Sequence, residues 1–332
     1  DTPGLDDEGE LGQMRIKKAY QMLNKTDIAL VVVDAGEGLS PLEETLLETI
    51  QKKHIPYLLV FNKSDTAKKQ DLPANSILVS AKTGENIVAL KEAIGACKPA
   101  DSKKRIVGDL IRPSDMIVLV TPIDEAAPKG RLILPQQQTI RDLLEADAIP
   151  VVTKENTLKT TLESLAKKPA MVITDSQAFA QVSKDTPLDI PLTSFSILMA
   201  RYKGFLEGAV QGVAAIETLQ DGDKVLICEG CTHHRQCEDI GTVKIPRWLR
   251  QHTGKELELV HTSGKDFPED LSPYRLVIHC GGCMLNEREV AYRQKCAADA
   301  GIPFTNYGIA IAYMTGILKR SIEIFPKLYT LI

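Results

Sequence analysis

This sequence of 332 residues lacks several features that would assign it to a common functional class. No GxxxxGK(S/T) stretch occurs, so the loop whose backbone amides and lysine cradle nucleotide phosphates is missing. Positive charge is not in excess, since the formal net charge is −4, and only 5% of the residues are aromatic. This composition argues against a nucleic-acid partner. No apolar stretch reaches the roughly 20 residues of a transmembrane helix, so no membrane partner is expected.

Disulfide-like cysteine spacing is also missing. The seven cysteines are odd in number and irregularly spaced, which favours a reducing compartment, and we therefore expect a cytoplasmic protein. The rest of the composition, 43% hydrophobic and 25% charged residues, is typical of a soluble globular protein. The length fits two or three domains.

Two short cysteine-containing segments are the most informative feature that is present. Cys231-Thr-His233 follows an apolar run over residues 224–228, and His279-Cys280-Gly-Gly-Cys283 follows another over 275–278. Runs of this kind are typical of buried parallel strands. Functional groups in α/β sheets collect beyond the carboxyl ends of the strands, so both segments should meet at one sheet edge. This arrangement predicts a metal site.

The residues leave the identity of the metal open. Three thiolates suit an iron–sulfur cluster or zinc, and unligated buried thiols are the third alternative. Cys231, Cys280 and Cys283 are the expected thiolate ligands, and a histidine could complete a zinc site. A 4Fe–4S cluster held by three cysteines would keep one exchangeable iron position. Glu238 is a weaker candidate ligand. The glycines at 230, 281 and 282 are consistent with backbone passing close to a bulky inorganic group.

The amino-terminal part resembles the second half of a translation-factor-type P-loop GTPase. The resemblance depends on three motifs in order: Asp1-Thr-Pro-Gly4, Asn62-Lys63-Ser-Asp65 and Ser80-Ala81-Lys82. It implies that the first motif senses magnesium and the γ-phosphate, that the second selects guanine and that the third supports the base. Because the phosphate loop is missing, we expect an amino-terminal truncation, and the chain as given should not hydrolyse GTP.

Alternating strand and helix patterns predict an α/β fold with parallel sheets. We expect a partial GTPase domain over 1–97, with its remnant sheet, followed by two parallel-sheet α/β domains over 98–219 and 220–332. A long helical pattern covers 194–219. The middle domain carries no concentrated chemistry, so we expect it to form a homodimer.

The combination resembles HydF, the family of FeFe-hydrogenase maturation GTPases. The resemblance implies a 4Fe–4S cluster on Cys231, Cys280 and Cys283, with His233 and His279 either ligating or shaping the pocket. It gives His233, Glu238 or water as the exchangeable fourth ligand and implies that the middle domain dimerises. The implied activity is a scaffold, regulated by GTP and Mg²⁺, that delivers a di-iron precursor to apo FeFe hydrogenase. The implied partners also include the radical-SAM maturases HydE and HydG.

Two other functions compete with this interpretation. One is a GTPase with a structural zinc that acts in RNA or ribosome maturation, although the net charge disfavours it. The other is a thiol redox enzyme that uses Cys280 and Cys283, which would leave Cys231 and both histidines without a role.

Overall fold

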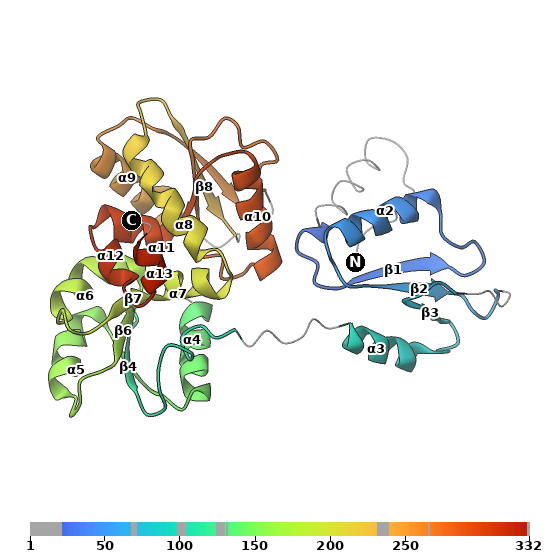
Figure 1. Cartoon of the computed structure of the whole chain (residues 1–332), viewed down its shortest axis with the longest axis horizontal. Helices are drawn as coiled ribbons and strands as arrows, with labels where there is room; N and C mark the ends of the chain where they lie inside the picture. The colour runs from blue at the N-terminus through green and yellow to red at the C-terminus, as the bar shows by residue number, and fades with distance from the viewer. Residues whose placement is uncertain are drawn as a thin grey trace. The chain divides into compact units, whose positions relative to one another are not determined.

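The structure is a computed structural model that describes residues 22–67, 72–97, 104–123, 130, 132–230, 239–264 and 266–330. The chain forms two compact units, Asp1–Lys103 and Lys104–Ile332. Each unit is built from parallel strands with covering helices, which confirms the predicted α/β class (Figure 1). Five of the predicted site residues lie outside the described residues: Asp1, Gly4, Cys231, His233 and Glu238.

The smaller unit is a three-stranded parallel sheet in the order β1-β2-β3. Its described elements are β1 (Ala29–Asp34), α2 (Pro41–Lys52), β2 (Tyr57–Asn62), β3 (Ser76–Leu78) and α3 (Ile87–Ala96). Successive β2 residues point to opposite faces. Leu59 and Phe61 therefore join the core beneath α2, whereas Leu58 and Val60 pack against α3. The two helices cover opposite faces of this sheet (Figure 1).

A capping box begins helix α2. The Ser40 side chain accepts a hydrogen bond from the backbone N–H of Glu43, and the Glu43 carboxylate accepts one from the backbone N–H of Ser40. Pro41 occupies the first turn, where its missing N–H is not needed. The helix start orients Leu47 and Ile50 toward the sheet, where both are buried.

The larger unit begins with a four-stranded parallel sheet in the order β5-β4-β6-β7. Its elements are β4 (Met116–Val120), α4 (Leu134–Glu145), β5 (Ile149–Thr153), η1 (Glu155–Thr157), α5 (Leu158–Ser164), β6 (Met171–Thr174), η2 (Ser176–Ala178), α6 (Phe179–Asp185) and β7 (Leu192–Ser194). The strand β4 is apolar throughout, and β6 is apolar up to its last residue, Thr174, because both faces of the two strands are covered.

The helical pattern over 194–219 does not form one helix. It forms α7 (Phe195–Tyr202), α8 (Leu206–Val213) and the short η3 (Ala214–Thr218), and its first residue, Ser194, belongs to β7. Gly204 adopts a φ of 80°, a left-handed conformation that ends α7 and redirects the chain. The apolar periodicity alone did not reveal this break.

A second four-stranded parallel sheet follows, in the order β11-β10-β8-β9. Its elements are β8 (Lys224–Glu229), η4 (Ile240–Lys244), α9 (Ile245–Thr253), β9 (Glu258–Ser263), β10 (Leu276–His279), α10 (Glu287–Asp299), β11 (Phe304–Asn306), α11 (Tyr307–Met314), α12 (Leu318–Ser321) and α13 (Pro326–Tyr329). His279 pairs with Cys228 on one side and Asn306 on the other, so these three strands end at one edge.

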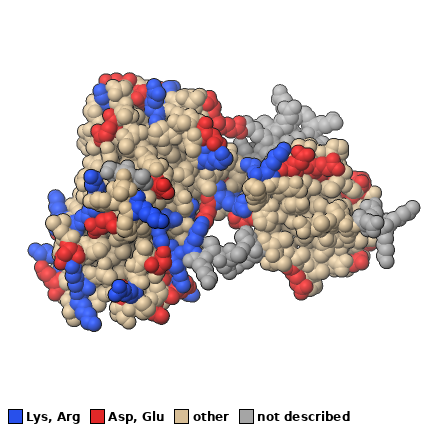
Figure 2. All heavy atoms as spheres, in the orientation of Figure 1, with Lys and Arg blue, Asp and Glu red and all other residues tan. Residues whose placement is uncertain are grey.

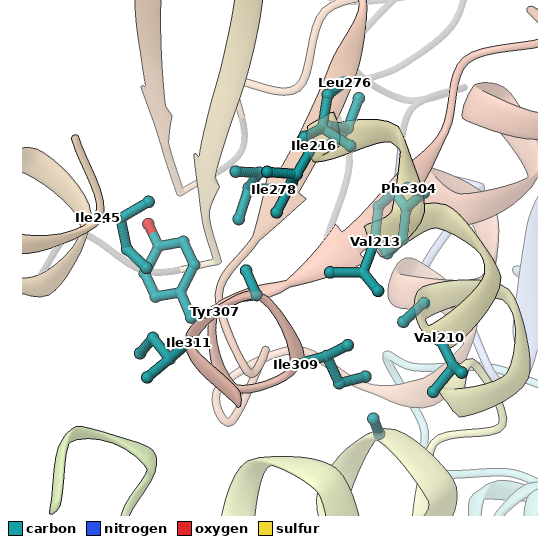
Figure 3. Packing of buried hydrophobic residues seen from close by; sticks show 14 of the residues in the cluster. Val210, Val213, Ile216, Ile245, Leu276, Ile278, Phe304, Tyr307, Ile309 and Ile311 are labelled. Atoms are coloured by element: carbon teal, nitrogen blue, oxygen red, sulfur yellow. The ribbon is translucent and has the colours of Figure 1, made fainter. Parts of the chain in front are cut away.

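One hydrophobic core joins the helices that follow the first sheet to the second sheet. It includes Val210 and Val213 of α8, Ile278 of β10, Phe304 of β11 and Ile309 of α11. Figure 3 shows these side chains converging, with Val213 beside Phe304. Fully burying such a side chain stabilises the fold by about 1.5–3 kcal/mol. The shared core therefore fixes α7 and α8 against the sheet that carries the cysteine segment.

Among the described helices, none combines the length and the apolar composition that spanning a bilayer requires. On the face of the larger unit that Figure 2 shows, lysine and arginine side chains lie among aspartate and glutamate side chains. The charge on this face is therefore mixed.

Candidate functional site

The two guanine-side motifs meet at the carboxyl edge of the smaller sheet. Asn62 is the last residue of β2, and it pairs with Asp34 at the end of β1. The Asn62 side-chain oxygen accepts a hydrogen bond from the backbone N–H of Ala81 at 3.0 Å. This bond links the two predicted base-binding loops directly.

A buried serine holds the aspartate of the second motif. Ser80 is fully buried, and its hydroxyl donates to Asp65 Oδ1 at 2.7 Å while accepting from the backbone N–H of Thr83 at 3.1 Å. The Ser80 hydrogen bond lowers the pKa of Asp65, and the Lys82 ammonium, 3.9 Å from Oδ2, acts in the same direction. The carboxylate retains lone pairs for further N–H donors such as those of a purine.

The lysine of this motif makes an ion pair within the protein. Lys63 adopts a φ of 68°, and its Nζ lies 2.6 Å from Asp34 Oδ2. Hydrogen bonding to Lys63 lowers the pKa of Asp34, and the same bond raises the pKa of Lys63. The structure thus brings together the described members of the predicted guanine site: Asn62, Lys63, Asp65, Ser80, Ala81 and Lys82.

The second sheet edge carries Cys280, directly after β10. Its sulfur accepts two backbone hydrogen bonds, from Gly230 N at 3.0 Å and from Gly282 N at 3.3 Å. Donors of this kind favour the thiolate over the thiol. Gly230 immediately precedes Cys231 in the sequence, so the sheet brings the beginning of one cysteine segment to the sulfur of the other.

The glycines here are explained by the protein itself. A side chain at Gly230 would lie 2.7 Å from Leu285 Cγ, and Gly282 adopts a φ of 62°, which favours glycine. An added Cβ at Gly281 would meet nothing within 4 Å. Close packing explains Gly230, and turn geometry explains Gly282. Neither glycine therefore requires a nearby inorganic group as its explanation.

His279 is fully buried and has partners on both ring nitrogens. Nδ1 lies 2.7 Å from the carbonyl oxygen of Cys280, and Nε2 lies 3.2 Å from a guanidinium nitrogen of Arg293. A carbonyl only accepts and a guanidinium only donates, so Nδ1 carries the proton. Burial, reinforced by the charge of Arg293, lowers the pKa of His279 to about 3. These contacts support the pocket-shaping role among the two alternatives for this histidine.

Arg293 of α10 is a buried cation with defined partners. It is 1% exposed, pairs with Glu289 at 2.9 Å and donates to the carbonyl oxygen of Gly264 at 2.7 Å. Its guanidinium also lies 5.2 Å from the centre of the Phe267 ring. Arg293 therefore fixes the ring of His279, the residue that directly precedes Cys280. The sequence contained a signal for this burial, since Arg293 lies on the same helix face as the apolar Val290 and Ala297.

Lys203, at the end of α7, is a second buried cation that the sequence analysis missed. It is 7% exposed, and its Nζ donates to the carbonyl oxygens of Gly282 and Leu285, the latter at 2.7 Å. Burial lowers the pKa of Lys203, whereas negative charge on Cys283 and Cys280 raises it. The lysine thus clamps the loop that carries both cysteines.

Other predicted features of the site have separate outcomes. In the part of the chain that the structure describes, no three metal-binding side chains gather closely enough to hold an ion. Cys228 is buried inside β8, where desolvation raises its pKa to about 12, so it packs as an apolar group. The ligand roles of Cys280 and Cys283 stay predictions.

The fold and its two edges define a class of protein: a GTPase-type unit followed by an α/β unit with a cysteine-bearing sheet edge. The hydrogen maturase F dimerization domain matches residues 106–204, and the hydrogen maturase F tetramerization domain matches residues 207–324. A 50S ribosome-binding GTPase domain matches residues 1–63. The chain therefore belongs to the hydrogen maturase F family of hydrogenase-maturation GTPases, and the two domain matches support self-association.

Curated relatives are similar to this chain over part of their length. GTPase Era of Carboxydothermus hydrogenoformans is 26% identical over 174 residues, covering 52% of each protein. GTPase Era of Caldicellulosiruptor saccharolyticus is 32% identical over 84 residues, 25% of this chain and 28% of that protein. GTPase Der of Rhizobium leguminosarum is 29% identical over 174 residues, 49% of this chain and 34% of that protein. The chain thus spans about half or less of the length of these relatives.

Proposed function

We propose that this protein is a scaffold that holds a 4Fe–4S cluster with one exchangeable iron position. In this proposal Cys231, Cys280 and Cys283 supply the thiolates. The scaffold receives a di-iron precursor, prepared with HydE and HydG, and delivers it to apo FeFe hydrogenase. GTP and Mg²⁺, bound through the motifs that include Asn62 and Asp65, regulate the exchange in the full-length protein.

The main support for this proposal is that the loop carrying Cys280 and Cys283 is surrounded by hydrogen-bond donors and a buried cation, which favour negative charge on its sulfurs. The Cys280 sulfur accepts two backbone hydrogen bonds, and the Lys203 ammonium is buried against carbonyl oxygens of the same loop. An uncompensated buried cation is costly, and the thiolates of a metal site would supply the compensating charge. The donor set therefore fits an iron–sulfur cluster, whose potential depends on hydrogen bonds to its sulfurs.

When bound, such a cluster would supply an iron atom open to an exchangeable guest. The protein's own residues would orient and enclose it: Lys203 fixes the loop, and His279 with Arg293 supports its base. His233, Glu238 and water remain the candidates for the fourth position. None of the five described cysteines forms a disulfide, which supports a reducing compartment such as the cytoplasm.

We also propose that residues 98–219 form a homodimer. The strand β5 lies at the edge of the first sheet, and its Ile149 and Val152 are 47% and 48% exposed. Exposed apolar residues on an edge strand offer a surface for a second copy. Sedimentation that finds only monomers at micromolar concentration would argue against this assignment.

Metal analysis of anaerobically reconstituted protein tests the cluster. We expect iron with acid-labile sulfide and a visible cluster absorption band. Zinc without sulfide would instead support the GTPase with a structural zinc, and neither metal would support the thiol redox enzyme. The match of residues 106–204 and 207–324 to hydrogen maturase F domains favours the cluster.

Cys280→Ser should abolish most of the iron and sulfide, because it removes a thiolate that the fold positions with two backbone donors. Cys296→Ser is the matched control, since Cys296 is a partly buried cysteine on α10 outside the two motifs. Equal cluster content in the two variants would contradict the assignment of Cys280 as a ligand.

A further inference from the structure

The stretch of chain that follows the boundary between the two units is held firmly by α7. This joining segment, residues 105–109, lies at the start of the larger unit. Arg201, in the last turn of α7, donates hydrogen bonds to the carbonyl oxygens of Arg105 and Ile106, both at 3.2 Å. The same guanidinium pairs with the Asp109 carboxylate through two hydrogen bonds, one of them 2.9 Å long. One side chain of α7 therefore holds both ends of the joining segment.

The same end of α7 also holds the cysteine loop, residues 280–285. Lys203, which follows Arg201 by two residues, donates hydrogen bonds to the carbonyl oxygens of Gly282 and Leu285. Side chains two residues apart on a helix do not face each other, so the two cations reach different surroundings. The end of α7 is thus bonded to the joining segment on one side and to the cysteine loop on the other.

Helix α7 is packed between two hydrophobic cores. Ile197 and Ala200 belong to the core around the second sheet, whereas Leu198 and Met199 belong to the core of the first sheet. None of these four side chains is more than 2% exposed. Because protein interiors are close-packed and transmit strain, a helix held in this way moves as one body. A displacement at one contact of its last turn is therefore passed on to the other.

An ion pair makes a second connection between the same two regions. Lys104, the first residue of the larger unit, lies 2.6 Å from the Glu287 carboxylate. Glu287 begins α10, two residues after Leu285 of the cysteine loop. The two side chains are 47% and 38% exposed, so water screens this pair more than it screens the buried Lys203. The point where the chain enters the larger unit is nevertheless linked to the end of the cysteine loop.

We propose that the end of α7 is a joint that couples the joining segment to the cysteine loop. Arg201 and Lys203 are its positioning residues, since each acts through the backbone that it holds. A change in the smaller unit that shifts the joining segment would therefore loosen or tighten the loop that carries Cys280 and Cys283. The use of this joint in regulation by GTP rests on the proposed function, but the coupling itself does not require a bound cluster.

Hydrogen exchange of backbone amides, measured by mass spectrometry on the full, reduced and metal-free chain, tests the coupling. Two amides of the cysteine loop are hydrogen-bonded and so report its opening. The N–H of Gly282 donates to the Cys280 sulfur, and the N–H of Leu285 donates to the carbonyl oxygen of Gly282. Strand β8, residues 224–228, is buried in the same sheet and reports the opening of the core.

The decisive variant is Asp109→Asn, which removes the charged partner of Arg201 on the side of the joining segment. It changes no residue of the cysteine loop. Exchange of the loop amides should nevertheless become about two- to fivefold faster, the range that the loss of one partly exposed ion pair allows. Exchange over residues 224–228 should stay as slow as in the parent, because the core remains closed.

Asp189→Asn is the matched control, since it removes an aspartate from an exposed ion pair with Lys168 in the same unit. It should leave the exchange of the cysteine loop unchanged, and faster exchange there would contradict the inference. Lys203→Met breaks the joint on the side of the loop and should speed loop exchange about tenfold. Adding Asp109→Asn to Lys203→Met should then have no further effect, because coupled residues do not act additively.

The remaining outcomes also decide the question. Unchanged loop exchange in Asp109→Asn overturns the inference. Equal acceleration of the loop and of residues 224–228 overturns it too, because the larger unit would then open as a whole. A double variant in which the two single effects multiply would mean that the two sides of α7 act independently, and this also overturns it. Iron and sulfide analysis of the reconstituted parent judges the proposed function separately, since a parent without a cluster overturns that function and leaves the coupling standing.

Discussion

The two candidate sites lie at equivalent places, beyond the carboxyl ends of parallel strands, yet they are built differently. At the smaller sheet, Lys63 pairs with Asp34 while its side chain remains 63% exposed. At the second sheet of the larger unit, Arg293 is 1% exposed and pairs with Glu289. Lys203 and His279 are also buried there. The comparison teaches that strand ends collect functional groups in both units, but burial decides how strongly each group is held.

Solvent explains the difference in strength. Exposed ion pairs contribute about 0–1 kcal/mol because water and salt screen them. Removing one partner from a buried polar network leaves another group without its hydrogen bond, which costs about 1–3 kcal/mol per group. We therefore expect substitutions at the cysteine edge to disturb the fold more than substitutions at the guanine edge.

The largest expected effect is that of Lys203→Met. It leaves the carbonyl oxygens of Gly282 and Leu285 without their donor, so the free energy of unfolding of the larger unit should fall by about 2–4 kcal/mol. Cluster content after reconstitution should fall with it. Urea unfolding and iron analysis measure the two effects.

The control for this prediction is Lys224→Met in the same unit. Lys224 pairs with Glu258, but its side chain is 43% exposed, so the loss should stay below about 1 kcal/mol. If both lysine variants lose the same stability, burial does not distinguish the two edges.

His279 should affect stability only in the acid range, and hardly at all near neutral pH. Its folded-state pKa of about 3 lies below the unfolded value of 6.5. Between these values the unfolded chain binds a proton that the folded chain does not, so stability falls as the pH falls through this window. In the metal-free protein, His279→Gln should reduce this pH dependence by nearly one proton.

Urea unfolding at a series of pH values measures that slope. His252→Gln, which removes a partly exposed imidazole from the same unit, controls for the general effect of losing a histidine. An unchanged acid slope in His279→Gln would show that the imidazole is not held neutral by its surroundings.

The smallest effect should come from the guanine edge. Ser80→Ala removes the bonds to Asp65 and Thr83, and the local stability around β3 should fall by about 1–2 kcal/mol. Hydrogen exchange of backbone amides over residues 76–90 measures this change, with Ser76→Ala, at a partly buried serine outside the two motifs, as the control. Faster exchange in the larger unit as well would mean that the two edges are coupled.

Apolar runs made the strands predictable. The runs over 224–228 and 275–278 became β8 and β10 with changes of at most one residue at their ends. Helices were less certain, because apolar periodicity does not reveal a left-handed glycine. Gly204 divides the pattern over 194–219. The short strand β7, Leu192–Ser194, was missed because three residues show no period.

The candidate site was predictable only in part. Cys280 and Cys283 stood out because their motif follows an apolar run. Lys203 did not, because it lies 79 residues before Gly282 in the chain and meets that loop only through the shared core.

The sequence by itself determined which residues could bind metal or guanine, since side-chain chemistry and motif order are written in the chain. It also determined the parallel α/β class, because buried strands and amphipathic helices have different apolar periods. Only the tertiary structure decided which charges are buried. Burial depends on packing between segments distant in sequence, and it gave Lys203, Arg293 and His279 their partners.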